Sequence, residues 1–183
     1  MNFCSHCGAD ALEFRVPEGD VKPRHVCRQC GHIHYLNPKT VVGTLPRWRD
    51  QVLLCRRGIE PRYGLWTLPA GFLEIGEAID EGARRETLEE AIAAVAIDRL
   101  YTVISMPDIG QLHLMFLADL PHPEFSAGAE TLEARLFDEA DIPWETLAFR
   151  TVSRTLRCYF WDRWQIRRKE QEAFPLRVSS LRR

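Results

Sequence analysis

Three closely spaced glutamates are the first candidates for chemistry in this sequence. Glu86, Glu89 and Glu90 stand at positions i, i+3 and i+4, so on a helix all three carboxylates point to one side. Three like charges on one face cost stability unless a positive charge joins them. Mg²⁺ prefers oxygen ligands and commonly bridges carboxylates to substrate phosphates. The spacing indicates a divalent-metal site for phosphate chemistry, with a solvated acidic helix face as the alternative.

The segment before these glutamates strengthens the metal-site interpretation. Gly71 and Gly76 permit a tight, irregular approach from a strand into the helix. Glu77 starts that helix, and Arg85 lies eight residues on, about two turns along the same face. We therefore expect Arg85 to brace the loop or the acids of the helix rather than to reach for substrate.

Two C-x-x-C-G motifs form a second candidate metal site. They are Cys4-Ser5-His6-Cys7-Gly8 and Cys27-Arg28-Gln29-Cys30-Gly31, with 19 residues between the pairs. Zinc is bound by thiolates in a tetrahedron, and a C-x-x-C turn presents two of them on one side. The spacing is typical of a zinc ribbon, and four protein ligands leave no open position for chemistry, so the predicted zinc is structural.

Alternatives to four thiolate ligands stay open at this point. The cysteines could be redox-active or spare. Four histidines in the same segment could replace a thiolate: His6, His25, His32 and His34. Cys55 and Cys158 have no partner signature, and we expect buried packing roles for both.

Composition limits the classes of protein that fit. The 183 residues suffice for one catalytic domain with a small appendage, and 45% of them are hydrophobic. The net charge of −2 favours neither bulk nucleic-acid binding nor attraction to a membrane surface. The sequence contains no run of about 18 apolar residues and starts without a secretory signal. We expect a cytoplasmic protein, whose cysteines lie in a compartment where stable disulfides are rare.

The pattern of apolar residues predicts the elements that must position these groups. A helix over 77–95 carries the glutamates, and a second helix is expected over 144–166. The expected extended segments are 41–45, 51–56, 66–69, 100–106, 111–120 and 132–137. This order predicts an α+β fold, a sandwich with a mixed sheet.

The segment from Gly71 to Glu90 resembles the Nudix box. That pattern is Gly, five residues, Glu, seven residues, Arg-Glu, an apolar-type residue, any residue and Glu-Glu, and every fixed position is met, with Thr87 at the apolar-type position. The family pattern continues with Gly where this chain has Ile92. We expect that departure to alter packing at the helix end rather than the chemistry.

The resemblance extends over most of residues 1 to about 145. The four-cysteine segment, Asn37-Pro38-Lys39 and Leu65-Trp66-Thr67-Leu68-Pro69-Ala70-Gly71 are similar to the zinc-ribbon Nudix hydrolases related to NADH pyrophosphatases. Those enzymes carry a Ser-Gln-Pro-Trp-type signature after the box, whereas this chain has Ser105-Met106-Pro107-Asp108-Ile109-Gly110-Gln111. The resemblance therefore points to the branch that acts on FAD or ADP-ribose rather than to NADH itself.

The resemblance implies an architecture and an activity. It implies a zinc ribbon over 1–36, a Nudix α/β/α sandwich over 37–170 and a basic tail over 171–183, which we expect to be solvated. The implied activity is Mg²⁺- or Mn²⁺-dependent hydrolysis of a nucleoside diphosphate derivative to monophosphates. Two alternatives remain: a hydrolase of nucleoside triphosphates or RNA ends, and a non-catalytic protein that senses a ligand and binds nucleic acid. We expect a homodimer without nucleic acid or membrane as a partner.

The resemblance also implies roles for individual residues. Glu86, Glu89 and Glu90 would hold the metal, and Glu86 is the favoured base. Glu130 matches a late metal-ligand position, with Glu133 as its rival.

The residues themselves offer further candidates for substrate contacts. Either of two arginines could form a fork with a phosphate, Arg56 or Arg57. Three aromatic residues could stack a base or flavin ring: Tyr63, Trp66 and Phe72. Weaker candidates for substrate contacts are Lys39 and Arg62.

Overall fold

A computed structural model describes residues 1–182, so Arg183 at the end of the expected tail lies outside the described residues. The chain divides into two compact units, Met1–Asn37 and a larger unit that begins at Pro38. No helix within residues 1–182 is long and apolar enough to cross a membrane.

The first unit is a small antiparallel sheet. Its strands are β1 (Leu12–Arg15), β2 (Arg24–Cys27) and β3 (Ile33–His34), in the order β1-β2-β3. The sheet has few residues with which to form a core, and its fully buried side chains include Cys4, Val26 and Cys27. A unit this small usually needs a metal or disulfides to fold.

The second unit is built on a mixed sheet of eight strands. The main path runs β10-β5-β4-β9-β8-β11, with β6 beside β5 and β7 beside β4. Central strands β4 and β9 are parallel, and the β4–β5, β8–β9 and β5–β10 pairs are antiparallel. The strands are β4 (Lys39–Trp48), β5 (Gln51–Arg57), β6 (Trp66–Thr67), β7 (Ala70–Phe72), β8 (Ala96–Met106), β9 (Gln111–Asp119), β10 (Thr131–Phe137) and β11 (Arg177–Ser180).

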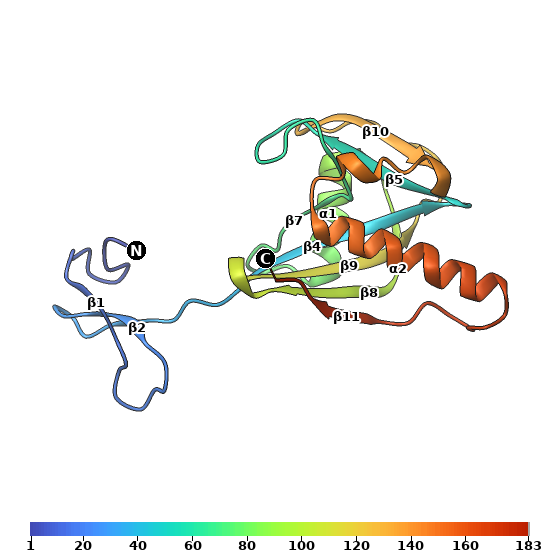
Figure 1. Ribbon diagram of the computed structural model, residues 1–183. Helices are drawn as coiled ribbons and strands as arrows, with labels where there is room; N and C mark the ends of the chain where they lie inside the picture. The colour runs from blue at the N-terminus through green and yellow to red at the C-terminus, as the bar shows by residue number, and fades with distance from the viewer. Residues whose placement is uncertain (183) are drawn as a thin grey trace. The chain divides into compact units, whose positions relative to one another are not determined.

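Two helices cover the two faces of this sheet (Figure 1). Helix α1 (Ile79–Ala91) packs on the face that presents Val42 and Phe116, and helix α2 (Arg150–Arg167) packs on the face that presents Leu45 and Leu117. Successive residues of a strand point to opposite faces, so neighbouring positions of β4 and β9 serve different helices. The predicted α/β/α sandwich with a mixed sheet is confirmed.

The two lone cysteines lie in these layers. Cys55 is 1% exposed and belongs to a core cluster with Leu53 and Ala91, and burial raises the pKa of its thiol. Cys158 is half-buried and packs against the α2 cluster. Both therefore have the packing roles expected from the sequence.

The first helix is shorter than the predicted 77–95. It ends at Ala91, and Ile92 follows with φ 47°, in the left-handed region. The backbone carbonyls of Glu90 and Ala91 accept N–H groups from Gly128 and Ser126, so the later segment replaces the next helical turn. This long-range pairing explains why the local pattern overestimated the helix.

The second helix begins later than the predicted 144. Residues 144–146 form a short 3-10 turn, as do 107–109 and 139–141. The Ala148 N–H then bonds the Trp66 carbonyl at 2.8 Å, so the chain pairs with β6 before α2 starts at Arg150.

The expectation of a solvated C-terminal tail is wrong for Arg177–Ser180. These residues form β11, which pairs parallel with β8. The carboxylate of Asp162, fully buried in α2, accepts the Tyr101 hydroxyl at 2.7 Å and pairs with the Arg177 guanidinium. A buried acid of this kind is tolerated because both partners satisfy it, so Arg177 ties the end of the chain to α2.

Ile92→Gly is predicted to stabilise the protein by about 1 kcal/mol, because glycine adopts a left-handed φ without a Cβ penalty. Denaturant unfolding measures the change. Ile92→Ala is the matched control, since it removes most of the side chain but keeps the Cβ. An equal gain in both variants would show that the side chain, not the backbone conformation, is responsible.

Candidate functional site

One cavity of about 1180 Å³ lies within the second unit. Its walls come from β4, β7, β9, the glutamate face of α1 and the first turns of α2. All four predicted metal ligands line the cavity. They are Glu86, Glu89 and Glu90 from α1, and Glu130 from the segment before β10. A cavity of this size exceeds what a diphosphate alone requires, so it has room for attached groups.

Arg85 holds the acidic face of α1 together. Its Nε and Nη2 donate to the two carboxylate oxygens of Glu77 at 3.0 and 2.8 Å. Its Nη1 donates to Glu86 at 2.7 Å and to Glu89 at 3.1 Å, and Nη2 also reaches the Phe72 carbonyl at 3.2 Å. This hydrogen bonding to Arg85 lowers the pKa of the Glu77 carboxyl to about 2. One guanidinium therefore ties the loop to three acids.

Glu90 occupies a more enclosed position than Glu89. One of its carboxylate oxygens accepts the Ala70 N–H at 3.2 Å. Burial raises the pKa of Glu90 to about 7, and the charges of Glu86 and Glu130 act in the same direction. Burial also raises the pKa of Glu86, although the adjacent Arg85 opposes it. Both carboxyls are thus destabilised as anions, a condition that a bound cation relieves.

Gly71 allows the Glu86 carboxyl of α1 to reach the sheet. A Cβ built at Gly71 would lie 2.3 Å from the carboxyl atoms of Glu86. Gly71 pairs with Val42 in the β4–β7 ladder, so the Glu86 carboxyl rests against this part of the sheet. The motif glycine is therefore needed for close approach of a candidate metal ligand.

The structure distinguishes between rival acids and between neighbouring arginines. Glu130 lines the cavity just before β10, whereas Glu133 lies on β10 outside the lining. Arg57 lines the cavity, and its Nε donates to the Pro61 carbonyl at 2.9 Å. Arg56 is outside the lining and donates to the Gly64 carbonyl. Of the weaker basic candidates, Arg62 lines the cavity and Lys39 does not.

Only one of the three aromatic candidates lines the cavity. Phe72 does so and is 50% exposed. Trp66 is 7% exposed and packs edge-on against Phe137 in the core, with ring centroids 4.9 Å apart. Tyr63 is exposed but outside the lining.

Sequence reasoning missed the part of the cavity wall that contains no glutamate. Its lining comes from the end of β8, the 107–109 turn, β9 and the start of α2, and includes Met106, Ile109, Gln111, His113, Met115 and Phe149. A signal was available in 111–118, where two polar side chains alternate in an otherwise apolar central strand. The segment at the position of the missing NADH-type signature, Ser105 to Gln111, contributes three of these lining residues.

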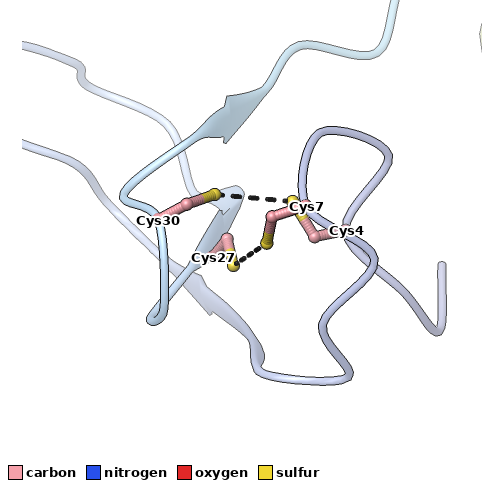
Figure 2. A group of neighbouring side chains, drawn as sticks. All are labelled: Cys4, Cys7, Cys27 and Cys30. Carbon is pink, nitrogen blue, oxygen red and sulfur yellow. Dashed lines mark hydrogen bonds between the residues drawn. The ribbon is translucent and has the colours of Figure 1, made fainter.

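The four cysteines converge in the first unit (Figure 2). Their sulfurs all lie within 4.8 Å of one another, with Cys4–Cys30 at 3.7 Å and Cys7–Cys27 at 3.6 Å. Zn–S bonds of about 2.3 Å in a tetrahedron require S–S distances of roughly 3.8 Å. The donor set and its spacing therefore fit zinc. Of the described residues, no other group of three or more candidate ligands is gathered as tightly.

The glycine after each C-x-x-C pair and the position of the buried histidine agree with a four-thiolate site. Gly8 and Gly31 have positive φ and donate backbone N–H bonds to the carbonyls of Cys4 and Cys27. His34 is buried and its Nδ1 lies 3.3 Å from the Ser5 hydroxyl, outside the sulfur cluster.

Family models match both units. Residues 2–36 match the model described as Nudix N-terminal, a zinc ribbon, and residues 37–158 match the model described as NUDIX domain.

The chain is similar to two curated proteins and covers different shares of their lengths. The chain is 32% identical to an ADP-ribose pyrophosphatase of Methanocaldococcus jannaschii over 60% of this chain and 67% of that protein. It is 29% identical to the NAD-capped RNA hydrolase NudC of Photobacterium profundum over 76% of this chain, and there it spans half the length of the relative.

Solved structures share the fold. A NUDIX hydrolase from Nitrosomonas europaea matches all of both chains with a TM-score of 0.90 and 45% identity. An ADP-ribose pyrophosphatase from Streptococcus suis matches 79% of this chain and all of its own with a TM-score of 0.60; at 20% identity it shows the fold alone.

Gly71→Ala is predicted to displace the Glu86 carboxyl, because the added Cβ collides with it, and to lower the free energy of unfolding by at most about 1 kcal/mol, since that carboxyl is the far end of a flexible side chain. A double-mutant cycle with Glu86→Ala tests the cause. If the collision is responsible, Gly71→Ala costs almost nothing in the Glu86→Ala background. An equal cost in both backgrounds would place the strain elsewhere.

Proposed function

Because the chain belongs to the NUDIX family of hydrolases, we propose that it cleaves the diphosphate linkage of ADP-ribose to AMP and ribose 5-phosphate. The observation that carries this proposal is a single cavity of about 1180 Å³ that is lined both by glutamates of α1 and by apolar side chains such as Met106, Ile109 and Met115. A diphosphate joined to a nucleoside needs both kinds of surface. The likeness to a named ADP-ribose pyrophosphatase supports this substrate class, and FAD is the next candidate.

The proposed catalytic groups are four of the glutamates that line the cavity. Glu86, Glu89, Glu90 and Glu130 offer the carboxylate oxygens that Mg²⁺ or Mn²⁺ prefers. A bound divalent cation would neutralise the diphosphate and lower the pKa of its water. Glu86, held against Gly71, is the proposed base that accepts the proton of the attacking water. Arg57, which also lines the cavity, is the proposed donor to a phosphate oxygen.

A second candidate substrate is the NAD cap of an RNA. Several similar proteins carry the name NAD-capped RNA hydrolase, and the likeness to one of them covers 76% of this chain. The chain carries a net charge of −2, which offers little general attraction for a long polyanion. Turnover of capped RNA with a catalytic efficiency above that of free ADP-ribose would replace the first proposal by this one.

Glu89→Gln combined with Glu90→Gln is predicted to lower Mg²⁺-dependent turnover of ADP-ribose at least about a hundredfold, because two metal ligands are lost. Release of AMP, followed by chromatography, measures the rate. Glu133→Gln is the matched control and should turn over at the wild-type rate. Undiminished activity in the double variant would contradict the role of the acidic helix.

We also propose that the first unit binds one structural zinc per chain. Cys27→Ser with Cys30→Ser is predicted to abolish zinc binding, measured by elemental analysis, and to unfold residues 1–37. Cys55→Ser is the control, since that thiol lies in the second unit, and it should leave the zinc content unchanged. Zinc-free wild-type protein purified without chelator would contradict the proposal.

The homodimer stays a prediction. Exposed Trp161 and Trp164 on α2 pack against each other with ring centroids 5.3 Å apart and give it some support. A monomer mass in sedimentation equilibrium would contradict it.

A further inference from the structure

The cavity end formed by β9 has an unassigned polar pair. Gln111 and His113 are two residues apart on one strand, so their side chains share the face covered by α2. Both are half-buried and both line the cavity. Around them the walls are mostly apolar, with Met106, Ile109 and Met115 beside the pair. Two polar groups in an apolar wall are the usual means by which a pocket fixes the orientation of a ring.

The hydrogen bond within the pair fixes what each side chain offers to a ligand. His113 Nε2 lies 2.9 Å from Gln111 Oε1. An amide oxygen only accepts, so Nε2 carries the hydrogen and donates. Burial lowers the pKa of His113, so the ring is neutral and its Nδ1 is an acceptor. The Gln111 amide nitrogen keeps its two hydrogens for donation.

The register of the sheet relates this pair to the acids. His113 pairs with Val41 in β4, and Val41 pairs with Phe72 in β7 on the other side. Neighbouring strands are about 4.8 Å apart, so His113 lies roughly 10 Å across the sheet from β7. The Glu86 carboxyl rests against Gly71, the neighbour of Phe72, whose position faces α1 rather than α2. The two groups are joined by the single cavity that both of them line, and this cavity is the path from a base at His113 to a phosphate at the glutamates.

We propose that Gln111 and His113 form a nucleobase subsite selective for adenine, in which His113 Nδ1 accepts the 6-amino group and the Gln111 amide donates to a ring nitrogen. The inference rests on the proposed function, because it assigns the base end of the same substrate. Hypoxanthine has a 6-carbonyl group in place of the amino group. That oxygen would face the His113 lone pair without a hydrogen between them, so the subsite disfavours it.

Equilibrium binding separates this subsite from catalysis. Calorimetry on the full-length protein with Mg²⁺ compares AMP, IMP and ribose 5-phosphate, none of which contains a diphosphate linkage. We expect wild-type protein to bind AMP about tenfold more tightly than IMP. Gln111→Leu with His113→Phe should reduce AMP affinity to that for IMP and leave ribose 5-phosphate unchanged. Leu112→Met, on the opposite face of the same strand, is the control and should keep the wild-type ratio.

The outcomes distinguish the subsite from the proposed function. Equal affinity of wild-type protein for AMP and IMP, or a wild-type ratio in the double variant, overturns the subsite. Selectivity for AMP without hydrolysis of ADP-ribose overturns the proposed substrate and leaves the subsite intact. Circular dichroism verifies folding, and the single variants Gln111→Leu and His113→Phe replace the double variant if it does not fold. Each single variant is then expected to lose part of the AMP preference.

Discussion

Repulsion among carboxylates on one face of α1 is the constraint on which the site depends. Arg85 relieves it by bonding Glu77, Glu86 and Glu89 at once. The same guanidinium reaches the Phe72 carbonyl, so the strand before the helix is tied to the charge cluster. Close packing around it then limits side-chain size. A Cβ at Gly71 would meet Glu86, and one on Gly82 would lie 2.7 Å from Glu77. Most of the fixed residues of the motif therefore surround the Arg85 charge or, like Gly71, make room for an acid that bonds it.

The opposite wall of the cavity depends on a second set of buried polar contacts. Helix α2 supplies the first-turn residues of that wall, and its place on the sheet is set by Thr155 with Thr102 and by Asp162 with Tyr101 and Arg177. Removing one partner of a buried, hydrogen-bonded acid leaves an uncompensated charge. The C-terminal strand is thus linked to the cavity wall that carries the proposed subsite, although no residue of β11 lines the cavity. Fold stability and the geometry of the proposed subsite are linked through these contacts.

The sequence predicted features whose signals are local and failed where distant residues decide. Helical spacing placed Glu86, Glu89 and Glu90 on one face, and the C-x-x-C spacing brought the cysteines together. The helix end at Ala91 depends on backbone bonds from residues 126–128, which no pattern near residue 91 reveals. Strand β11 depends on Asp162 in another element. Glu130 rather than Glu133 lines the cavity, and β10 has a register shift between Thr131 and Glu133, which removes any simple alternation rule.

The hydrogen bonds of Arg85 separate anchoring of the loop from assembly of the proposed metal ligands. Its Nε and Nη2 bind Glu77 and Phe72, whereas Nη1 alone binds Glu86 and Glu89. A divalent cation that takes up the latter carboxylates competes with one nitrogen only, so the loop stays held while those side chains change partners. Glu90, whose oxygen accepts the Ala70 N–H, contributes without that exchange. Under the proposed function the helix would offer one ligand positioned by the backbone and two released from a neighbouring charge, so that the acids are stable before a metal joins them.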